Sequence, residues 1–392
     1  MSKASVSVSK SKIIHGVLAK WINFRLVISI LHLTMIHCKH PLKAIKNWRK
    51  ITERRKKVRG FNKISRYVKS NGRYFWAEQI PGFPSKQFNE FIIGELVRCK
   101  PGDGSHSQLT TVVFSITGRC GLKCLHCFEW DNLNDKEQLT MEALQAILEK
   151  LGDTGLTHIQ FGGGEPLARF NDLLTLVEKA QSSMDGWILT SGFGLTKEKA
   201  MRLRRAGLTG ANISLDHWQP DAHNAFRNHQ KSYHWVNQAV KNCLEAGIIV
   251  SLALCATREF VTKDNLDRYL DLAKKWGVGF VRILEPLNAG RFKDKDIKLG
   301  KPHLELLKNV YLASYSEKRY RDHPIIMYPG FTQRQLGCMG AGNRYFYIDS
   351  KGDIHACPFC HGAVGNAIHD SLDDAIGKLK AKGCHSFSLS NI

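Results

Sequence analysis

The sequence of 392 residues predicts an α/β protein whose central feature is a parallel sheet. From residue 110 onward, short β-branched runs alternate with amphipathic helical stretches, which is the order of a βα repeat. The composition is 43% hydrophobic and 23% charged, so the chain can bury a large core and is neither disordered nor fibrous. We predict four segments, at residues 1–70, 71–107, 108–325 and 326–392.

The predicted sheet has six strands, at residues 110–116, 158–163, 186–191, 210–216, 248–255 and 279–286. The segments between them carry apolar residues at helical spacing, as in the sets Leu144, Ile147, Leu148, Leu151 and Trp235, Ala239, Val240, Cys243. We therefore expect Cys243, and likewise Cys255 in the fifth strand, to belong to the core. In parallel βα folds, the loops after the carboxyl ends of the strands build the functional site.

The first 70 residues are strongly basic. They contain 18 Lys or Arg and a single acid, Glu53, and so account for most of the formal net charge of +22. Residues 21–38, WINFRLVISILHLTMIHC, could be mistaken for a membrane span. Their mostly apolar stretch from Leu26 to Ile36 covers 11 residues, short of the ~20 that a spanning helix needs.

We expect this segment to form a basic amphipathic helix on an anionic membrane surface, with anchors at Trp21, Phe24, Trp48 and the cluster Arg54–Arg59. The same charge is compatible with nucleic-acid binding, because phosphates also attract Lys and Arg. A third interpretation is a solvated basic face packed on the main domain.

The segment 71–107 is predicted to be an ordered lead-in with a helix over residues 88–97, followed by the linker KPGDGSHS. Its Cys99 is expected to be structural. The chain has 11 cysteines, and the closely spaced ones do not form the disulfide framework of a small secreted protein. A reduced, cytosolic compartment fits this pattern better.

Three cysteines follow the first predicted strand, in the stretch SITGRCGLKCLHCFEW at residues 115–130. Cys120, Cys124 and Cys127 have the spacing C-x3-C-x2-C. A 4Fe-4S cluster usually takes four thiolates, so three on one short loop leave the fourth iron free for another ligand. Open catalytic metal sites differ from closed structural ones in the same way.

This motif after the first strand resembles the signature of the radical S-adenosylmethionine (radical SAM) superfamily, in which the position of His126 is usually aromatic. The resemblance implies a partial (β/α)6 TIM-like barrel and a 4Fe-4S cluster on Cys120, Cys124 and Cys127. It implies that the amino and carboxylate groups of S-adenosylmethionine bind the fourth iron. Reductive cleavage would then give a 5′-deoxyadenosyl radical that abstracts hydrogen from an unactivated C–H bond.

Other strand ends resemble the family's contacts to S-adenosylmethionine. The turn FGGGEPL after the second strand resembles the GGEP turn that contacts the methionine amino group, and LTSG and ISLD resemble polar strand ends near the ribose and carboxylate. The resemblance implies cofactor contacts from Gly163, Gly164, Glu165, Thr190, Ser191, Ser214 and Asp216. The segment HNAFR, with His223 and Arg227, resembles an H-D-x-x-R segment, but Asn224 and His217 depart from that pattern, so no catalytic role is carried over.

A second cysteine group lies beyond the barrel, at Cys338, Cys357, Cys360 and Cys384. The stretch YFYIDSKGDIHAC predicts a β-hairpin around SKGD that brings Cys338 and Cys357 near one another. This region resembles a twitch or reduced SPASM extension, which implies an auxiliary Fe-S cluster. A zinc site with four thiolates is the alternative, and His385 could replace Cys384 as a ligand.

We therefore expect a radical SAM enzyme acting on a substrate that is lipid-linked or lies at a membrane surface. A peptide or protein maturase of the SPASM/twitch type is the alternative, followed by an RNA-modifying enzyme and a non-catalytic Fe-S carrier. The expected partner is an electron donor such as flavodoxin or ferredoxin. The expected location is cytoplasmic, peripheral at the inner face of the membrane, and no residue is assigned as a proton donor or acceptor.

Overall fold

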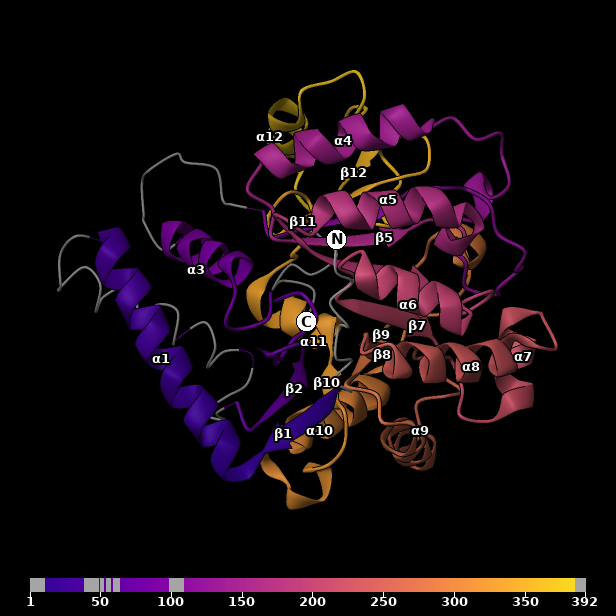
Figure 1. Cartoon of the computed structure of the whole chain (residues 1–392). Coiled ribbons are helices and arrows are strands. Elements are labelled where there is room, and N and C mark those ends of the chain that lie inside the picture. The colour runs from indigo at the N-terminus through magenta and orange to yellow at the C-terminus, as the bar shows by residue number, and fades with distance from the viewer. Residues whose placement is uncertain are drawn as a thin grey trace.

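The computed structural model describes residues 11–38, 64–98 and 109–384, together with single helical positions at 49, 53 and 58 (Figure 1). Its main sheet has nine strands in the order β10-β9-β8-β7-β6-β5-β4-β11-β12. A second, antiparallel sheet has the order β1-β2-β3. The predicted anchors at Trp48 and in the basic cluster, together with Cys99, the linker and His385, lie outside the described residues.

All six predicted strands form and pair in parallel, each with the next along the chain. They are β4 Thr111–Ser115, β5 His158–Gly162, β6 Asp185–Thr190, β7 Gly210–Ser214, β8 Ile249–Cys255 and β9 Phe280–Leu284. The helices between and after them are α4 Met141–Asp153, α5 Phe170–Ala180, α6 Lys197–Arg205, α7 Pro220–Arg227, α8 Ser232–Glu245, α9 Lys263–Trp276 and α10 Lys301–Ser316. The predicted α/β fold with a partial parallel barrel is confirmed.

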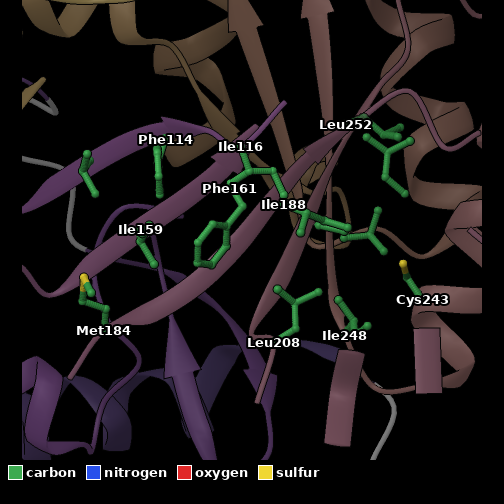
Figure 2. Close-up of a cluster of buried hydrophobic side chains, with 14 of the residues drawn as sticks. Phe114, Ile116, Ile159, Phe161, Met184, Ile188, Leu208, Cys243, Ile248 and Leu252 are labelled. Atoms are coloured by element: carbon green, nitrogen blue, oxygen red, sulfur yellow. The ribbon is translucent and has the colours of Figure 1, made fainter. Parts of the chain in front are cut away.

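The barrel core lies between the sheet and these helices, as Figure 2 shows for part of it. Phe114 and Phe161 come from neighbouring strands, and Cys243 comes from α8; all three are fully buried. The prediction that Cys243 is a core residue is therefore confirmed. Truncation of Phe161 to alanine would cost about 3–5 kcal/mol of stability, because the packed surroundings cannot close the cavity.

The C-terminal extension adds strands at both edges of the six-stranded barrel sheet. Its elements are β10 Ile325–Met327, α11 Pro329–Leu336, β11 Tyr345–Ile348, β12 Ile354–His355 and α12 Leu372–Lys382. The predicted hairpin is present, since β11 pairs with β12 in antiparallel fashion. Beyond that prediction, β11 also pairs in parallel with β4, and β10 pairs with β9 at the other edge.

The N-terminal extension consists of β1 Lys12–His15, α1 Gly16–Cys38, β2 Arg66–Ser70, β3 Arg73–Phe75 and α3 Lys86–Arg98. Helix α3 covers the predicted helix at residues 88–97. Helix α1 corrects the expectation of a short apolar stretch, because it has 23 residues and is long and apolar enough to cross a membrane by length and composition. It also corrects the expectation of an amphipathic helix, since apolar side chains are both buried and exposed around it.

This extension closes the amino end of the barrel. Val68 and Phe75 pack against side chains near the starts of β6, β8, β9 and β10. Arg73 forms an ion pair with Asp185 at 2.6 Å. Buried Glu78 pairs with Arg282, whose Nε lies 2.6 Å from the Glu78 carboxylate. The β2–β3 hairpin crosses the predicted boundary between segments 1–70 and 71–107. The four segment boundaries themselves stay predictions.

Candidate active site

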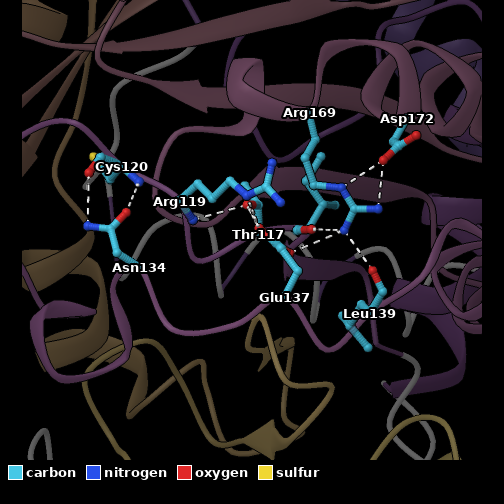
Figure 3. Close-up of polar contacts among 9 residues, drawn as sticks. Thr117, Arg119, Cys120, Asn134, Glu137, Leu139, Arg169 and Asp172 are labelled. Carbon is cyan, nitrogen blue, oxygen red and sulfur yellow. Dashed lines mark hydrogen bonds and ion pairs between the residues drawn. The ribbon is translucent and has the colours of Figure 1, made fainter.

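The three-cysteine loop begins directly after β4, at the carboxyl end of the sheet, and it is held in place from several sides. The Asn134 side chain both accepts a hydrogen bond from the Cys120 amide at 3.0 Å and donates to its carbonyl at 3.1 Å (Figure 3). The Leu125 amide donates to the carbonyl of Phe226 in α7 at 3.0 Å. The Arg291 amide donates to the Cys127 carbonyl at 3.0 Å. The backbone of the loop is therefore held from several sides, and none of the three thiols is used in a disulfide.

A charged network fixes the base of this loop (Figure 3). Arg169 donates to the carbonyls of Ile116 and Leu139, at 3.1 and 2.7 Å, and to Asp172 at 2.7 Å. Glu137 accepts from Thr117 and pairs with Arg169 at 3.3 Å. Ile116 directly follows β4, and Leu139 lies just before α4. By donating to both carbonyls, the Arg169 guanidinium holds the two ends of the connection that contains the cysteine loop close together.

The chemistry of the three thiols suits a metal cluster. Cys120, Cys124 and Cys127 are all free, and burial raises the pKa of Cys120 to about 11 and that of Cys127 to about 12. Such thiols become good ligands when a cation replaces the proton, because the thiolate is the form that binds metal. Each cysteine of a cubane binds a different iron. No three His, Cys, Asp or Glu side chains of the described residues converge on a single-ion site.

Arg227 lies beside the cysteine loop as a buried positive charge. Its Nη1 is 3.6 Å from the Cys124 sulfur and its Nε donates to Asp216 at 2.6 Å. Although burial would raise the pKa of Asp216, the charge of Arg227 is the main influence that outweighs it and holds that pKa below its ordinary value. Asp216, predicted as a cofactor contact, thus holds Arg227, while Ser214 lies half-buried at the end of β7.

His126 occupies the position that is usually aromatic in the resembled signature. Its ring stacks on Phe226 with centroids 4.8 Å apart and lies 6.4 Å from Phe292. Burial lowers its pKa to about 4, so the ring is neutral at physiological pH. A neutral imidazole between two phenyl rings packs as an aromatic side chain would, which explains how histidine fits here.

The glycine turn after β5 packs directly against the cysteine loop. The Gly164 amide donates to the Thr117 carbonyl at 2.8 Å, and the Glu165 amide donates to the Arg119 carbonyl at 2.7 Å. A Cβ at Gly163 would overlap the Thr117 carbonyl oxygen, and one at Gly164 would overlap the Arg119 carbonyl oxygen. Gly163 also has a φ of +133°, which disfavours other residues. These glycines are therefore required by close backbone approach.

Three of the other predicted cofactor contacts meet in one network. Glu165 is buried, and its carboxylate accepts from the Thr190 hydroxyl at 2.7 Å and from the Ser191 hydroxyl and amide at 2.6 and 2.9 Å. Burial raises the pKa of Glu165 despite these bonds. A carboxylate in this position is suited to an ammonium partner, because a buried charge gains most from an opposite charge.

The second cysteine group also comes together. Burial, followed by the neighbouring Cys384 thiol, raises the pKa of Cys338 to about 12, and Cys384 also acts on the pKa of Cys360. The Cys360 amide donates to the Cys357 carbonyl at 3.0 Å, and the interaction between the two thiols lowers the pKa of Cys360 to about 6 and raises that of Cys357. Four thiols from three separate segments thus form one neighbourhood, although their role as ligands stays a prediction.

Aromatic residues connect the two cysteine groups, and sequence reasoning missed them. Phe128 follows Cys127, Phe359 precedes Cys360, and the two rings lie 5.5 Å apart in edge-to-face contact. Beside them, the Tyr347 hydroxyl donates to buried Glu129 at 2.5 Å. The only available signal was that an aromatic residue adjoins a cysteine in each motif. Their contact depends on the pairing of β11 with β4.

A cavity of about 460 Å³ opens next to the cysteine loop, at the carboxyl ends of β7, β8 and β9. Its exposed lining is mostly apolar, from residues such as Leu125, Phe226 and Phe292. It also carries charged side chains, at Asp216, Arg258, Glu259 and Asp296. A cavity of this size and character is typical of a small-molecule or side-chain binding site. Cys255, predicted as a core residue, is buried and also lines this cavity.

Comparisons with known proteins agree with this geometry. The sequence profile of the Radical SAM superfamily matches residues 114–274, from β4 into α9. The chain is 28% identical over 269 residues to the mycofactocin maturase MftC of Mycolicibacterium smegmatis, which covers 67% of this chain and 65% of that protein. It thus spans slightly less than two-thirds of that relative's length. It is 27% identical over 271 residues to the PqqA peptide cyclase of Streptomyces rochei, covering 67% and 72% respectively.

Among solved structures, the chain is similar to SuiB of Streptococcus suis bound to the precursor peptide SuiA. The TM-score is 0.58 at 16% sequence identity, and the match covers 80% of this chain and 74% of that one. At this level of identity, the likeness concerns the fold. The region matched exceeds the six-stranded barrel, which agrees with the additional strands at both sheet edges.

Proposed function

Because the chain belongs to the radical SAM superfamily, we propose that it is a maturase that modifies a ribosomally made peptide. That it is a radical SAM enzyme follows from the family. The peptide substrate is the proposal, and it replaces the lipid-linked substrate that we expected from the basic N-terminus. The similarity to a maturase and to a peptide cyclase supports the change.

One observation in the structure carries the proposal: the two cysteine groups are joined by the contact between Phe128 and Phe359. The C-terminal group is therefore attached to the barrel beside the loop where hydrogen abstraction would occur. A second Fe-S cluster at Cys338, Cys357, Cys360 and Cys384 would be placed to accept an electron from a substrate bound near the barrel opening. Zinc in the same thiol set could only fix structure, because it has no redox chemistry.

When bound, the first cluster and S-adenosylmethionine would supply the reductive cleavage and the radical. Cys120, Cys124 and Cys127 would hold the cluster, and Arg227 would offset part of its negative charge. Glu165 would orient the methionine ammonium group through the turn that Gly163 and Gly164 make possible. The apolar cavity would exclude water from the reacting centre. An electron donor such as flavodoxin or ferredoxin belongs to the same proposal.

Deuterium transfer tests which class of molecule supplies the hydrogen. Anaerobically reconstituted, reduced full-length protein receives S-adenosylmethionine and either a peptide extract or a lipid extract, each prepared from cells of its source organism grown on deuterated medium. We expect deuterium in 5′-deoxyadenosine with the peptide extract and none with the lipid extract. The Cys124→Ala protein is the control for background cleavage.

Transfer from the lipid extract alone would overturn the peptide substrate and restore the lipid-linked one. Absence of deuterium transfer from either extract, with undeuterated 5′-deoxyadenosine still formed, would exclude both substrate classes. Mass spectrometry of the peptide extract after the reaction then identifies the peptide whose mass changes.

A further inference from the structure

The outer face of α1 carries an unusual concentration of exposed apolar side chains. Twelve large apolar side chains are exposed in the described part of the chain, and eight of them lie on this one helix. The eight are Val17, Leu18, Trp21, Phe24, Val27, Ile28, Met35 and Ile36. Scattered single exposures are ordinary on a protein surface, but a contiguous patch marks an interaction site.

Helical geometry divides α1 into two apolar faces. At about 100° per residue, Val17, Trp21, Phe24, Ile28 and Met35 fall on one stripe, which we call the outer face. Trp21 and Phe24 stack there with ring centroids 5.7 Å apart. The opposite stripe is buried against α3 and β2 through Ala19, Ile22, Leu26 and Ile30. In Figure 1, α1 lies at the edge of the molecule beside α3.

Charged residues border the outer face. Lys20 and Arg25 are exposed on its two sides, as is His32. Residues 39–63, which follow the helix in the sequence, contain 11 Lys or Arg and one acid. An apolar stripe flanked by cations, next to a polybasic segment, is complementary to a bilayer that presents acyl chains below anionic headgroups.

The connections of α1 favour a helix that lies on the bilayer over one that crosses it. Strand β1 ends at His15, directly before the helix, and pairs with β2 so that His15 lies opposite Arg66. Both ends of the intervening segment 16–65 must therefore lie on the same side of a membrane. A crossing by α1 would require residues 39–63 to cross back, and their charge prevents that.

We propose that the outer face of α1 docks the enzyme on an anionic phospholipid bilayer. The docking surface belongs to the extension that closes the amino end of the barrel, whereas the cysteine loop and the cavity lie at the carboxyl end. Docking therefore tethers the enzyme and leaves the opening of the barrel accessible to a substrate in solution. This inference stands independently of the peptide substrate.

Vesicle sedimentation tests the proposal with the full chain. The probes are phosphatidylcholine vesicles with and without phosphatidylglycerol. We expect the native protein to pellet with the mixed vesicles and the variant Trp21→Glu/Phe24→Glu to bind at least about tenfold more weakly, because two aromatic anchors are lost. Both side chains are more than half exposed, so the substitutions leave the core intact.

A matched control adds the same two negative charges elsewhere. Asn237 and Gln238 are exposed on α8, and the variant Asn237→Glu/Gln238→Glu should pellet like the native protein. Equal pelleting of the Trp21/Phe24 variant would overturn the proposal, as would equal binding to vesicles without phosphatidylglycerol. A native dimer in light scattering that the Trp21/Phe24 variant abolishes, without vesicle binding, would instead assign the face to a second copy.

Extraction separates docking from insertion. Protein docked by the outer face should be released from the vesicles by alkaline carbonate, because only a stripe of side chains enters the bilayer. Resistance to carbonate would overturn the in-plane arrangement and indicate that α1 crosses the membrane.

Discussion

The two ends of the barrel use buried polar groups differently. At the amino end, buried charges are paired with protein groups alone: Glu78 with Arg282, and Asp185 with Arg73. At the carboxyl end, buried Glu165 accepts hydrogen bonds from Thr190 and Ser191 but has no cationic partner among the bonds described, and the three cysteines have no disulfide partner. Arg227 lies between these two cases, because it pairs with Asp216 and also reaches a cysteine.

This difference separates stability from chemistry along the barrel axis. Perturbing the amino end should lower the free energy of unfolding without altering the reaction of the folded protein, whereas perturbing the carboxyl end should abolish the reaction in a folded protein. The variants below test that separation, in order of expected effect.

The largest effect is expected for Cys124→Ala. Loss of one of three thiolates from the loop should abolish 5′-deoxyadenosine formation entirely and lower the iron content by up to about four atoms per chain. The measurement is product formation and iron content after anaerobic reconstitution. Cys243→Ala, a buried cysteine of the core, serves as the control and should retain the reaction. Residual cleavage in the Cys124 variant would contradict the assignment of the loop.

The variant Cys360→Ala should distinguish the function of the second cysteine group from that of the first. Under the proposed function, we expect 5′-deoxyadenosine formation to continue while the modified peptide disappears, because the loop on β4 stays intact and the proposed second electron acceptor is lost. Iron content should again fall by up to about four atoms. Unchanged iron content with loss of one zinc per chain would identify the group as a zinc site.

At the amino end, Arg282→Met should leave Glu78 buried without its partner. Breaking a buried pair on one side costs about 3–5 kcal/mol of unfolding free energy. The matched control is Arg258→Ala at the exposed pair with Asp296, which should cost less than about 1 kcal/mol. Denaturant unfolding measures both. Cleavage activity of the folded Arg282 variant should be unchanged, and its loss would contradict the separation of the two ends.

His158, also toward the amino end, should give a pH-dependent stability. Burial lowers its pKa from 6.5 to about 3. Between these two pH values, His158 is protonated in the unfolded chain and neutral in the folded protein. Stability from this group is complete above pH 6.5 and falls by about 1.4 kcal/mol per unit of pH below it. Between pH 7 and 5, the free energy of unfolding of the His158→Gln variant should therefore fall by about 2 kcal/mol less than that of the native protein. Parallel stability curves for the two proteins would refute this.

Local patterns were sufficient to predict the barrel and its first cysteine group. The six strands follow from β-branched runs, and the spacing of Cys120, Cys124 and Cys127 lies within one loop. The bonds of Asn134 to Cys120 span 14 positions within the same loop, but no motif indicates them. The contact of Arg227 with that loop joins residues 103 positions apart, and no spacing rule indicates it. The pairing of β11 with β4, which brings Phe359 to Phe128, was missed for the same reason.

The length of α1 was underestimated for a different reason. Polar residues such as Asn23 interrupt its apolar sequence and suggested that the hydrophobic stretch begins only at Leu26. In the structure, the Asn23 side chain donates to the carbonyls of Ala19 and Ile64, at 2.9 and 2.7 Å. Its polarity is thereby satisfied within the fold, and the helix continues through it.

The position of β4 between β5 and β11 has a consequence for synthesis on the ribosome. Thr111 pairs with His158 on one side and with Tyr345 on the other, and these partners are 47 and 234 residues further along the chain. At about 5–20 residues per second, one edge of β4 stays unpaired for roughly 10–40 s after the other can close. An open strand edge invites aggregation, and here it adjoins three unprotected thiols. The nascent chain therefore exposes this strand edge and these thiols until β11, which lies in the last fifth of the sequence, has been translated.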